Sequence, residues 1–108
     1  MKVFEVGLIC EFEGGHGVLI ADSDSLYTDA KLYLLGSVSR KLRDMESLYD
    51  NELDEYEINL LAKLRKESQK AHEDIGKAKN IDDLRKIRME ESSLMVIVKE
   101  REVLGGGK

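Results

Sequence analysis

Three side chains could supply nucleophilic or metal-binding chemistry: Cys10, His16 and His72. A thiolate activated by a histidine is a nucleophile, and cysteine sulfur and imidazole nitrogen are common zinc ligands. Cys10, however, alternates with Leu8 and Phe12 on the apolar face of a predicted strand, where a thiol behaves as a small hydrophobic group. Three soft ligands without tetrahedral-site spacing do not make a zinc site. We therefore expect no catalytic residue, metal or cofactor, and both histidines at the surface.

Gly14, Gly15 and Gly17 invite comparison with a phosphate-binding loop. Such a loop follows a strand and opens a helix whose N-terminus faces the phosphate. Here residues 18–21 continue as a second apolar strand, and the lysine and hydroxyl residue of a P-loop are missing. The glycines therefore predict the turn of a hairpin.

Charged side chains crowd the middle of the chain. The acidic set surrounds a junction between two predicted helices and consists of Glu46, Asp50, Glu52, Asp54, Glu55 and Glu57. Helix N-termini favour carboxylates, and the spacing differs from that of a calcium loop, so an acidic docking surface is the functional alternative. The basic sets are Lys63, Arg65, Lys66 and Lys70, and then Arg85, Lys86 and Arg88. Acidic neighbours at helical spacing indicate a solvated, salt-bridged face, with nucleic-acid binding as the alternative.

Tyr33 falls beside the apolar stripe of its predicted helix, where a half-exposed aromatic side chain is suited to anchor a partner. We therefore expect partner-binding residues in the helical region. The candidates are Tyr33, Tyr56, Arg65, Lys66, Lys70, Glu52 and Glu55.

Strands must form at both ends of the chain. Apolar residues alternate from residue 2 to 12, which is typical of a strand with one buried face, and residues 17–22 follow as its hairpin partner. The apolar block at 94–98 has three β-branched members and predicts a strand within 93–103 that is buried on both faces or central in the sheet.

Helical periodicity fills the region between the strands. Apolar residues from Tyr27 to Leu48 recur at helical spacing and predict a helix over residues 28–49, with these residues as its core stripe. Asn51 with Asp54 is similar to a capping box that starts a second helix. The apolar stripe of this helix thins after Leu64, so we expect its far end to project into solvent or to meet a partner. Asn80 repeats the capping signal for a third helix ending near residue 91, and the sequence leaves open whether the last two helices are one.

Length and composition bound the organisation of the chain. Its 108 residues predict a single domain over 1–104, followed by a flexible glycine tail at 105–108. With 17 basic and 22 acidic residues, the net charge of -5 disfavours binding to nucleic acid or anionic lipid. The single cysteine and the lack of a long apolar stretch favour a cytoplasmic location without membrane attachment.

The order strand, turn, strand, helix, with a last strand running into glycines, resembles a β-grasp protein of the ubiquitin type. The residues that carry the resemblance are the stretch 91–98 and the pair Gly105-Gly106. The resemblance implies a conjugated modifier in which one of these glycines is activated as a carboxyl adenylate after the residues beyond it are removed. The charged helical region from 51 to 91 departs from that family, which has short strands and turns there.

Together these patterns predict an α+β fold. Its small, mainly antiparallel sheet has three strands, the N-terminal hairpin and the C-terminal strand, with a helical hairpin of two to three helices packed on one face. Such a sheet has two open edges. We expect the first or last strand to pair there with a second copy, in a homodimer.

The functional hypothesis is a small non-enzymatic binding or regulatory protein that docks another protein through its charged helices. Small acidic proteins without a catalytic site are often accessory, viral or phage-encoded, and such an origin belongs to this hypothesis. Two alternatives stay open: a nucleic-acid-binding module that uses the basic helix patches, and a ubiquitin-like modifier with a C-terminal diglycine.

Overall fold

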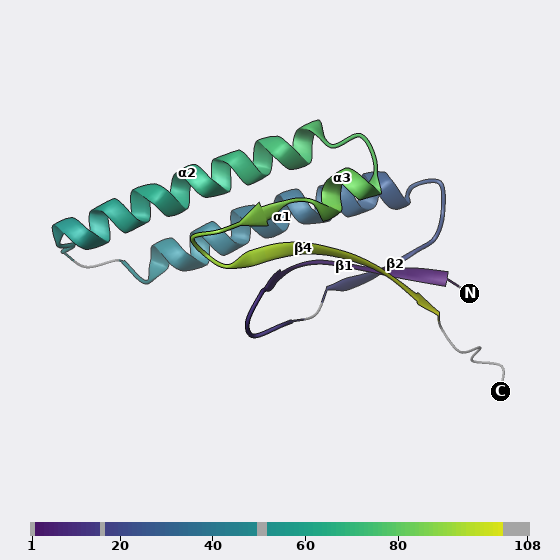
Figure 1. Cartoon of the computed structure of the whole chain (residues 1–108), viewed down its shortest axis with the longest axis horizontal. Helices are drawn as coiled ribbons and strands as arrows, with labels where there is room; N and C mark the ends of the chain where they lie inside the picture. Colours follow the sequence, from purple (N-terminus) through teal and green to yellow (C-terminus); the bar gives the residue numbers. More distant parts are fainter. Residues whose placement is uncertain (1, 16, 50–51, 103–108) are drawn as a thin grey trace.

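The computed structural model describes residues 2–15, 17–49 and 52–102, and its sheet is covered on one face by helices (Figure 1). The elements in chain order are β1 (Lys2–Cys10), β2 (Val18–Ala21), α1 (Leu26–Ser47), α2 (Glu55–Lys77), α3 (Ile81–Arg85), β3 (Arg88–Met89) and β4 (Leu94–Glu102). Neighbouring strands are antiparallel, in the order β2-β1-β4-β3. The predicted α+β class is confirmed, with four strands among the described residues instead of three.

The core lies between the sheet and the helices. Val6 of β1 belongs to one buried cluster with Leu34 of α1, Ile75 of α2 and Leu84 of α3, and all four side chains have no exposed surface. Because side chains alternate along a strand, the even-numbered residues of β1 face the helices and the odd-numbered residues lie on the opposite face. We call this opposite face the outer face of the sheet.

The strands at the two ends of the chain are both central in the sheet. β1 and β4 pair over nine residues, from Lys2 opposite Glu102 to Cys10 opposite Leu94. The expectation of an open edge is therefore wrong for β1, whereas β4 is open only beyond the residues that pair with β3. Each central strand is joined through a hairpin to a shorter strand, β2 or β3, which lies outside it and forms the edge.

β3 replaces the end of the predicted third helix. That helix was expected to reach residue 91, but α3 ends at Arg85. Ile87 and Met89 are buried on either side of the exposed Arg88, which is the alternation of a strand. The carbonyl of Ile87 accepts the N–H of Val96 at 3.2 Å, so this backbone pairs with β4 rather than continuing a helix.

The helices begin at capping residues that differ in part from those predicted. Asp54 caps α2: its carboxylate accepts the N–H of Glu57 at 2.8 Å, and the Glu57 carboxylate accepts the N–H of Asp54. The capping box is thus Asp54 with Glu57, and the predicted cap Asn51 lies outside the described residues. Asn80 caps α3 as expected, and the extended backbone at Ala78 makes α2 and α3 separate helices.

The end of α2 that projects is the opposite of the one expected. The stripe of α2 thins after Leu64, but the residues that thin it, Ser68 and Ala71, are buried, as is Ile75 beyond them. Small side chains here permit close packing and do not indicate exposure. The start of α2 and the end of α1 instead extend past the sheet (Figure 1).

None of the described helices is long and apolar enough to traverse a lipid bilayer. The predicted glycine tail at 105–108, with the diglycine of the modifier alternative, lies outside the described residues. The 23-residue helix α2 occupies a region where the ubiquitin family has short strands.

Candidate interaction surfaces

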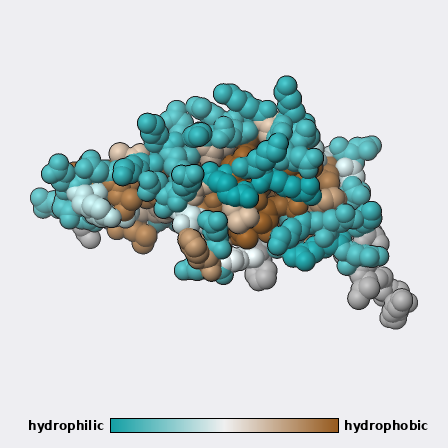
Figure 2. All heavy atoms as spheres, viewed as in Figure 1, coloured by the Kyte–Doolittle hydropathy of each residue, from teal (hydrophilic) through white to brown (hydrophobic). Residues whose placement is uncertain are grey.

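The joined ends of α1 and α2 form a projecting apolar surface, which we call the hairpin tip and define as residues 44–49 and 52–60. Three of its large apolar side chains are strongly exposed: Leu48 by 77%, Tyr56 by 73% and Ile58 by 54%. Figure 2 shows hydrophobic surface among hydrophilic surface at this end of the molecule. Isolated apolar side chains are common on protein surfaces, but three at the projecting end of one helical hairpin indicate a candidate contact site.

The hairpin tip is exposed because the apolar stripe of α1 continues beyond the end of the sheet. Leu48 lies about four helical turns after Leu34 and therefore on nearly the same face of the helix. Leu34 is fully buried, whereas Leu48 is the most exposed leucine among the described residues. The stripe that forms the core at one end of α1 is thus left open at the other.

Three of the predicted partner-binding residues come together at the hairpin tip: Tyr56, Glu52 and Glu55, all of them exposed. Glu57 and Asp54 are nearby but are used to cap α2. Ile58 was not among the predicted residues, and its only sequence signal is an apolar residue beside the stripe of α2. Leu48 was predicted to belong to the core stripe of the first helix, because periodicity alone does not show where the sheet ends.

The other predicted partner-binding residues lie elsewhere. Arg65 donates to Glu46 at 2.7 Å and joins α2 to α1. Tyr33 packs against the core cluster, with the guanidinium of Arg40 5.6 Å from its ring centroid. Lys66 and Lys70 line a separate groove. The seven candidates therefore do not form one site.

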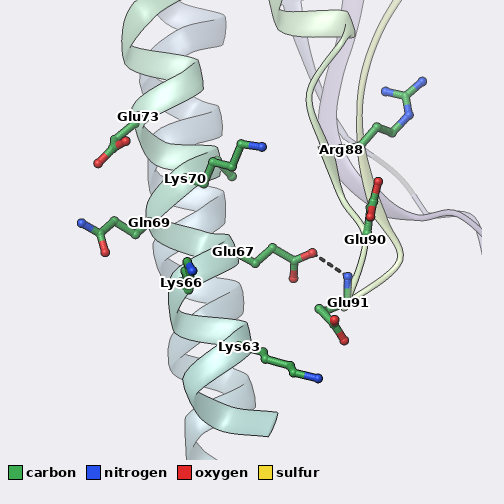
Figure 3. A pocket seen from close by; sticks show the side chains of 10 residues that line it. Lys63, Lys66, Glu67, Gln69, Lys70, Glu73, Arg88, Glu90 and Glu91 are labelled. Carbon is green, nitrogen blue, oxygen red and sulfur yellow. Dashed lines mark hydrogen bonds between the residues drawn. The ribbon is translucent and has the colours of Figure 1, made fainter. Parts of the chain in front are cut away.

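An open groove of about 630 Å³ runs between α2 and the hairpin of β3 and β4. Figure 3 shows Lys63 and Lys70 pointing from α2 toward this hairpin, and Gln69 and Glu73 pointing away from it. Four basic and four acidic side chains line the groove. Since their formal charges cancel, the groove does not present the concentrated positive charge that nucleic acid requires.

Glu67, in the middle of the groove, fixes the loop between β3 and β4. Its carboxylate accepts the N–H of Glu91 at 2.6 Å (Figure 3). It also accepts the hydroxyl and the N–H of Ser92 at 2.7 and 3.3 Å. Hydrogen bonds to a charged acceptor are stronger than neutral ones. Glu67 therefore has a structural role and is not free to bind a ligand.

Replacing Glu67 by alanine should lower the free energy of unfolding by about 1–3 kcal/mol, because the loop N–H groups lose a charged acceptor. Glu73→Ala is the matched control: this carboxylate lines the same groove, points away from the loop and forms no hydrogen bond with the described residues. It should change stability by no more than about 0.5 kcal/mol. Urea unfolding followed by circular dichroism measures both, and equal losses would show that Glu67 does not hold the loop.

Glu5 is a buried carboxylate on the outer face of the sheet, with 8% of its surface exposed. One carboxylate oxygen accepts from Nε and Nη2 of Arg101 at 3.1 and 2.9 Å, and the other accepts the N–H of Gly17 at 3.1 Å. Glu5 therefore connects β1 to both the end of β4 and the start of β2.

The residues considered for catalysis are only partly described. Cys10 is half-buried and packs against the core cluster, in agreement with a hydrophobic role, and His72 is exposed as expected. His16 lies outside the described residues. Over residues 2–15, 17–49 and 52–102, no group of three or more His, Cys, Asp or Glu side chains is placed to hold a metal ion.

Comparisons with protein-family models, curated proteins and solved structures find no match to this chain.

Proposed function

We propose that the protein is a small, non-enzymatic binding protein that docks another protein through the hairpin tip. The observation that carries this proposal is the exposure of Leu48, Tyr56 and Ile58 where the helical hairpin extends past the sheet. Burying large apolar side chains is the main driving force of association, and tyrosine is enriched among the residues that dominate binding energy.

The charges around the hairpin tip indicate the chemistry of the partner. Glu52 and Glu55 are exposed beside Tyr56, and neither carboxylate is hydrogen-bonded to a described residue. An apolar centre with an acidic rim complements an apolar pocket with a basic rim. We therefore expect the partner to present lysine or arginine side chains around an apolar depression.

The hairpin tip is also held in a defined shape. The capping box fixes the first turn of α2, and the ion pair between Arg65 and Glu46 ties α2 to the last turns of α1. A surface that is ordered before binding loses less conformational entropy when the partner docks. This ordering favours specific docking over nonspecific adhesion.

The proposal is tested by capturing partners from native lysate with three immobilised proteins: the wild type, Leu48→Asp and Leu32→Asp. Leu32 is the matched control, since it is 63% exposed on the same helix but lies away from the hairpin tip. A partner retained by the wild type and by Leu32→Asp should be lost with Leu48→Asp, with affinity reduced about tenfold or more. Equal retention by Leu48→Asp, or equal loss with Leu32→Asp, contradicts docking at the hairpin tip.

Nucleic-acid binding has weaker support as a second function. The lysines of the groove are interspersed with carboxylates, and aromatic residues for base stacking do not line it. The single cysteine of the chain fits the reducing cytoplasm, which we propose as the location.

A further inference from the structure

The open edges of the sheet differ in their chemistry. β2 forms one edge, and no described strand pairs with its free side. At the other edge β3 pairs only with the first residues of β4, so the second half of β4 is also open among the described residues. An open edge is a template for pairing with another chain unless it is protected.

The β4 edge is protected by charged side chains and the β2 edge is not. The open part of β4 carries Lys99, Glu100, Arg101 and Glu102, all exposed, and charged side chains oppose strand pairing. Nearer β3, Nε of Arg85 donates to the free carbonyl of Val98 at 2.9 Å. β2 consists of Val18, Leu19, Ile20 and Ala21, with no charge, and Leu19 is 64% exposed.

The register of the hairpin shows which backbone groups of β2 are available. Ile20 lies opposite Phe4, and the N–H of Asp22 donates to the carbonyl of Lys2 at 3.2 Å. Since hydrogen-bonding direction alternates along a strand, Ile20 and Asp22 direct their backbone groups toward β1. Leu19 and Ala21 therefore direct their N–H and C=O groups away from β1, along the open edge.

We propose that two copies of this chain pair antiparallel through β2, about a twofold axis perpendicular to the sheet. The occupant is a second copy because an uncharged strand pairs with itself without like-charge contacts, whereas the other open edge, β4, is charged. The pairing joins two four-stranded sheets into one continuous sheet, with both helical layers on the same side.

The geometry also assigns the register. In such a pairing the residues that lie opposite each other must point to the same face of the sheet. Four registers centred within β2 satisfy this, with Val18, Leu19, Ile20 or Ala21 opposite its own copy. The registers centred on Val18 and Leu19 would also use the N–H of Gly17, which already donates to Glu5, and the register centred on Ala21 would pair Leu19 with Ser23, beyond the end of β2. The register centred on Ile20 uses only the outward groups of Leu19 and Ala21, and is the one proposed.

Sedimentation velocity over a concentration series tests the pairing. The wild type should dimerise, and Leu19→Lys should weaken the dimer about tenfold or more, because it places a charge on the edge. Leu48→Lys, an equally drastic change at the exposed hairpin tip, should dimerise like the wild type. A wild type that stays monomeric to about 1 mM, or a dimer weakened by Leu48→Lys and not by Leu19→Lys, overturns the proposal.

The proposed register is tested by nuclear magnetic resonance. Opposite residues of a non-hydrogen-bonded antiparallel pair have Cα atoms about 4.5 Å apart. In a dimer of isotope-labelled and unlabelled chains, an intermolecular nuclear Overhauser effect should therefore join the two Ile20 Hα atoms. Intermolecular effects confined to α1 and α2 would place the dimer contact on the helices and overturn pairing through β2.

Discussion

Gly17→Ala should destabilise the protein by about 3 kcal/mol or more, enough to unfold much of a marginally stable domain. A β-carbon at residue 17 would lie 2.2 Å from the carbonyl oxygen of Val6 and 2.9 Å from the N–H nitrogen of Gly7. Both contacts are with backbone atoms of β1, which cannot move aside as a flexible side chain can. The substitution must therefore separate the start of β2 from β1, and it disturbs the hydrogen bond from Gly17 to Glu5.

Gly76→Ala is the control for this substitution. A β-carbon at residue 76, in the last turns of α2, meets no atom within 4 Å apart from its chain neighbours and the backbone of its own helix. Alanine is the better helix former, so this variant should be unchanged or more stable by up to about 1 kcal/mol. Urea denaturation monitored by circular dichroism compares the two variants. If Gly17→Ala unfolds at the wild-type midpoint, β2 does not approach β1 as closely as described.

Ile75→Ala should lower the free energy of unfolding by about 2–5 kcal/mol, because it removes a large side chain from the centre of the core. Ile75 has no exposed surface and belongs to the cluster that contains Val6, Leu34 and Leu84. The loss combines the transfer free energy of the removed carbons with the cost of the cavity that they leave.

Ile58→Ala is the matched control, since it makes the same substitution on the same helix. Ile58 is 54% exposed at the hairpin tip, and its truncation should cost no more than about 0.5 kcal/mol. The difference between the stability losses of the two variants shows which end of α2 packs on the sheet. A larger loss for Ile58→Ala than for Ile75→Ala would mean that the start of α2 is the buried end.

Much of the local structure could be predicted from the sequence. β1, β2 and β4 end within two residues of their predicted bounds, because the alternation of apolar residues is a local signal that survives packing. The cap at Asn80 was predictable because a capping side chain bonds to the backbone only three residues away, which is also a local signal. β3 was not predictable, because it has only two residues. The alternation of the buried Ile87 and Met89 around it is too short to be distinguished from the end of a helix.

The arrangement of the elements was less predictable. The apolar block at 94–98 indicated a central place for β4, but the central place of β1 depends on pairings between residues far apart in the chain. The sequence predicted the wrong end of α2 to project from the sheet. A stripe that thins to small residues predicts exposure, whereas Ser68 and Ala71 are buried because small side chains permit close packing. The candidate site was incompletely predicted for a similar reason. Leu48 continues the core stripe of α1 in the sequence, and only the length of the sheet shows that this side chain is exposed.

Hydrogen exchange of the protein bound to its captured partner tests docking through the hairpin tip most directly. Amides in the last turns of α1 and the first turns of α2, over residues 44–49 and 52–60, should exchange more slowly in the complex than in the free protein. Amides of β2 and of the loop held by Glu67 should be unchanged by the partner. Protection confined to the groove between α2 and β3, with none at the hairpin tip, would contradict the proposed function.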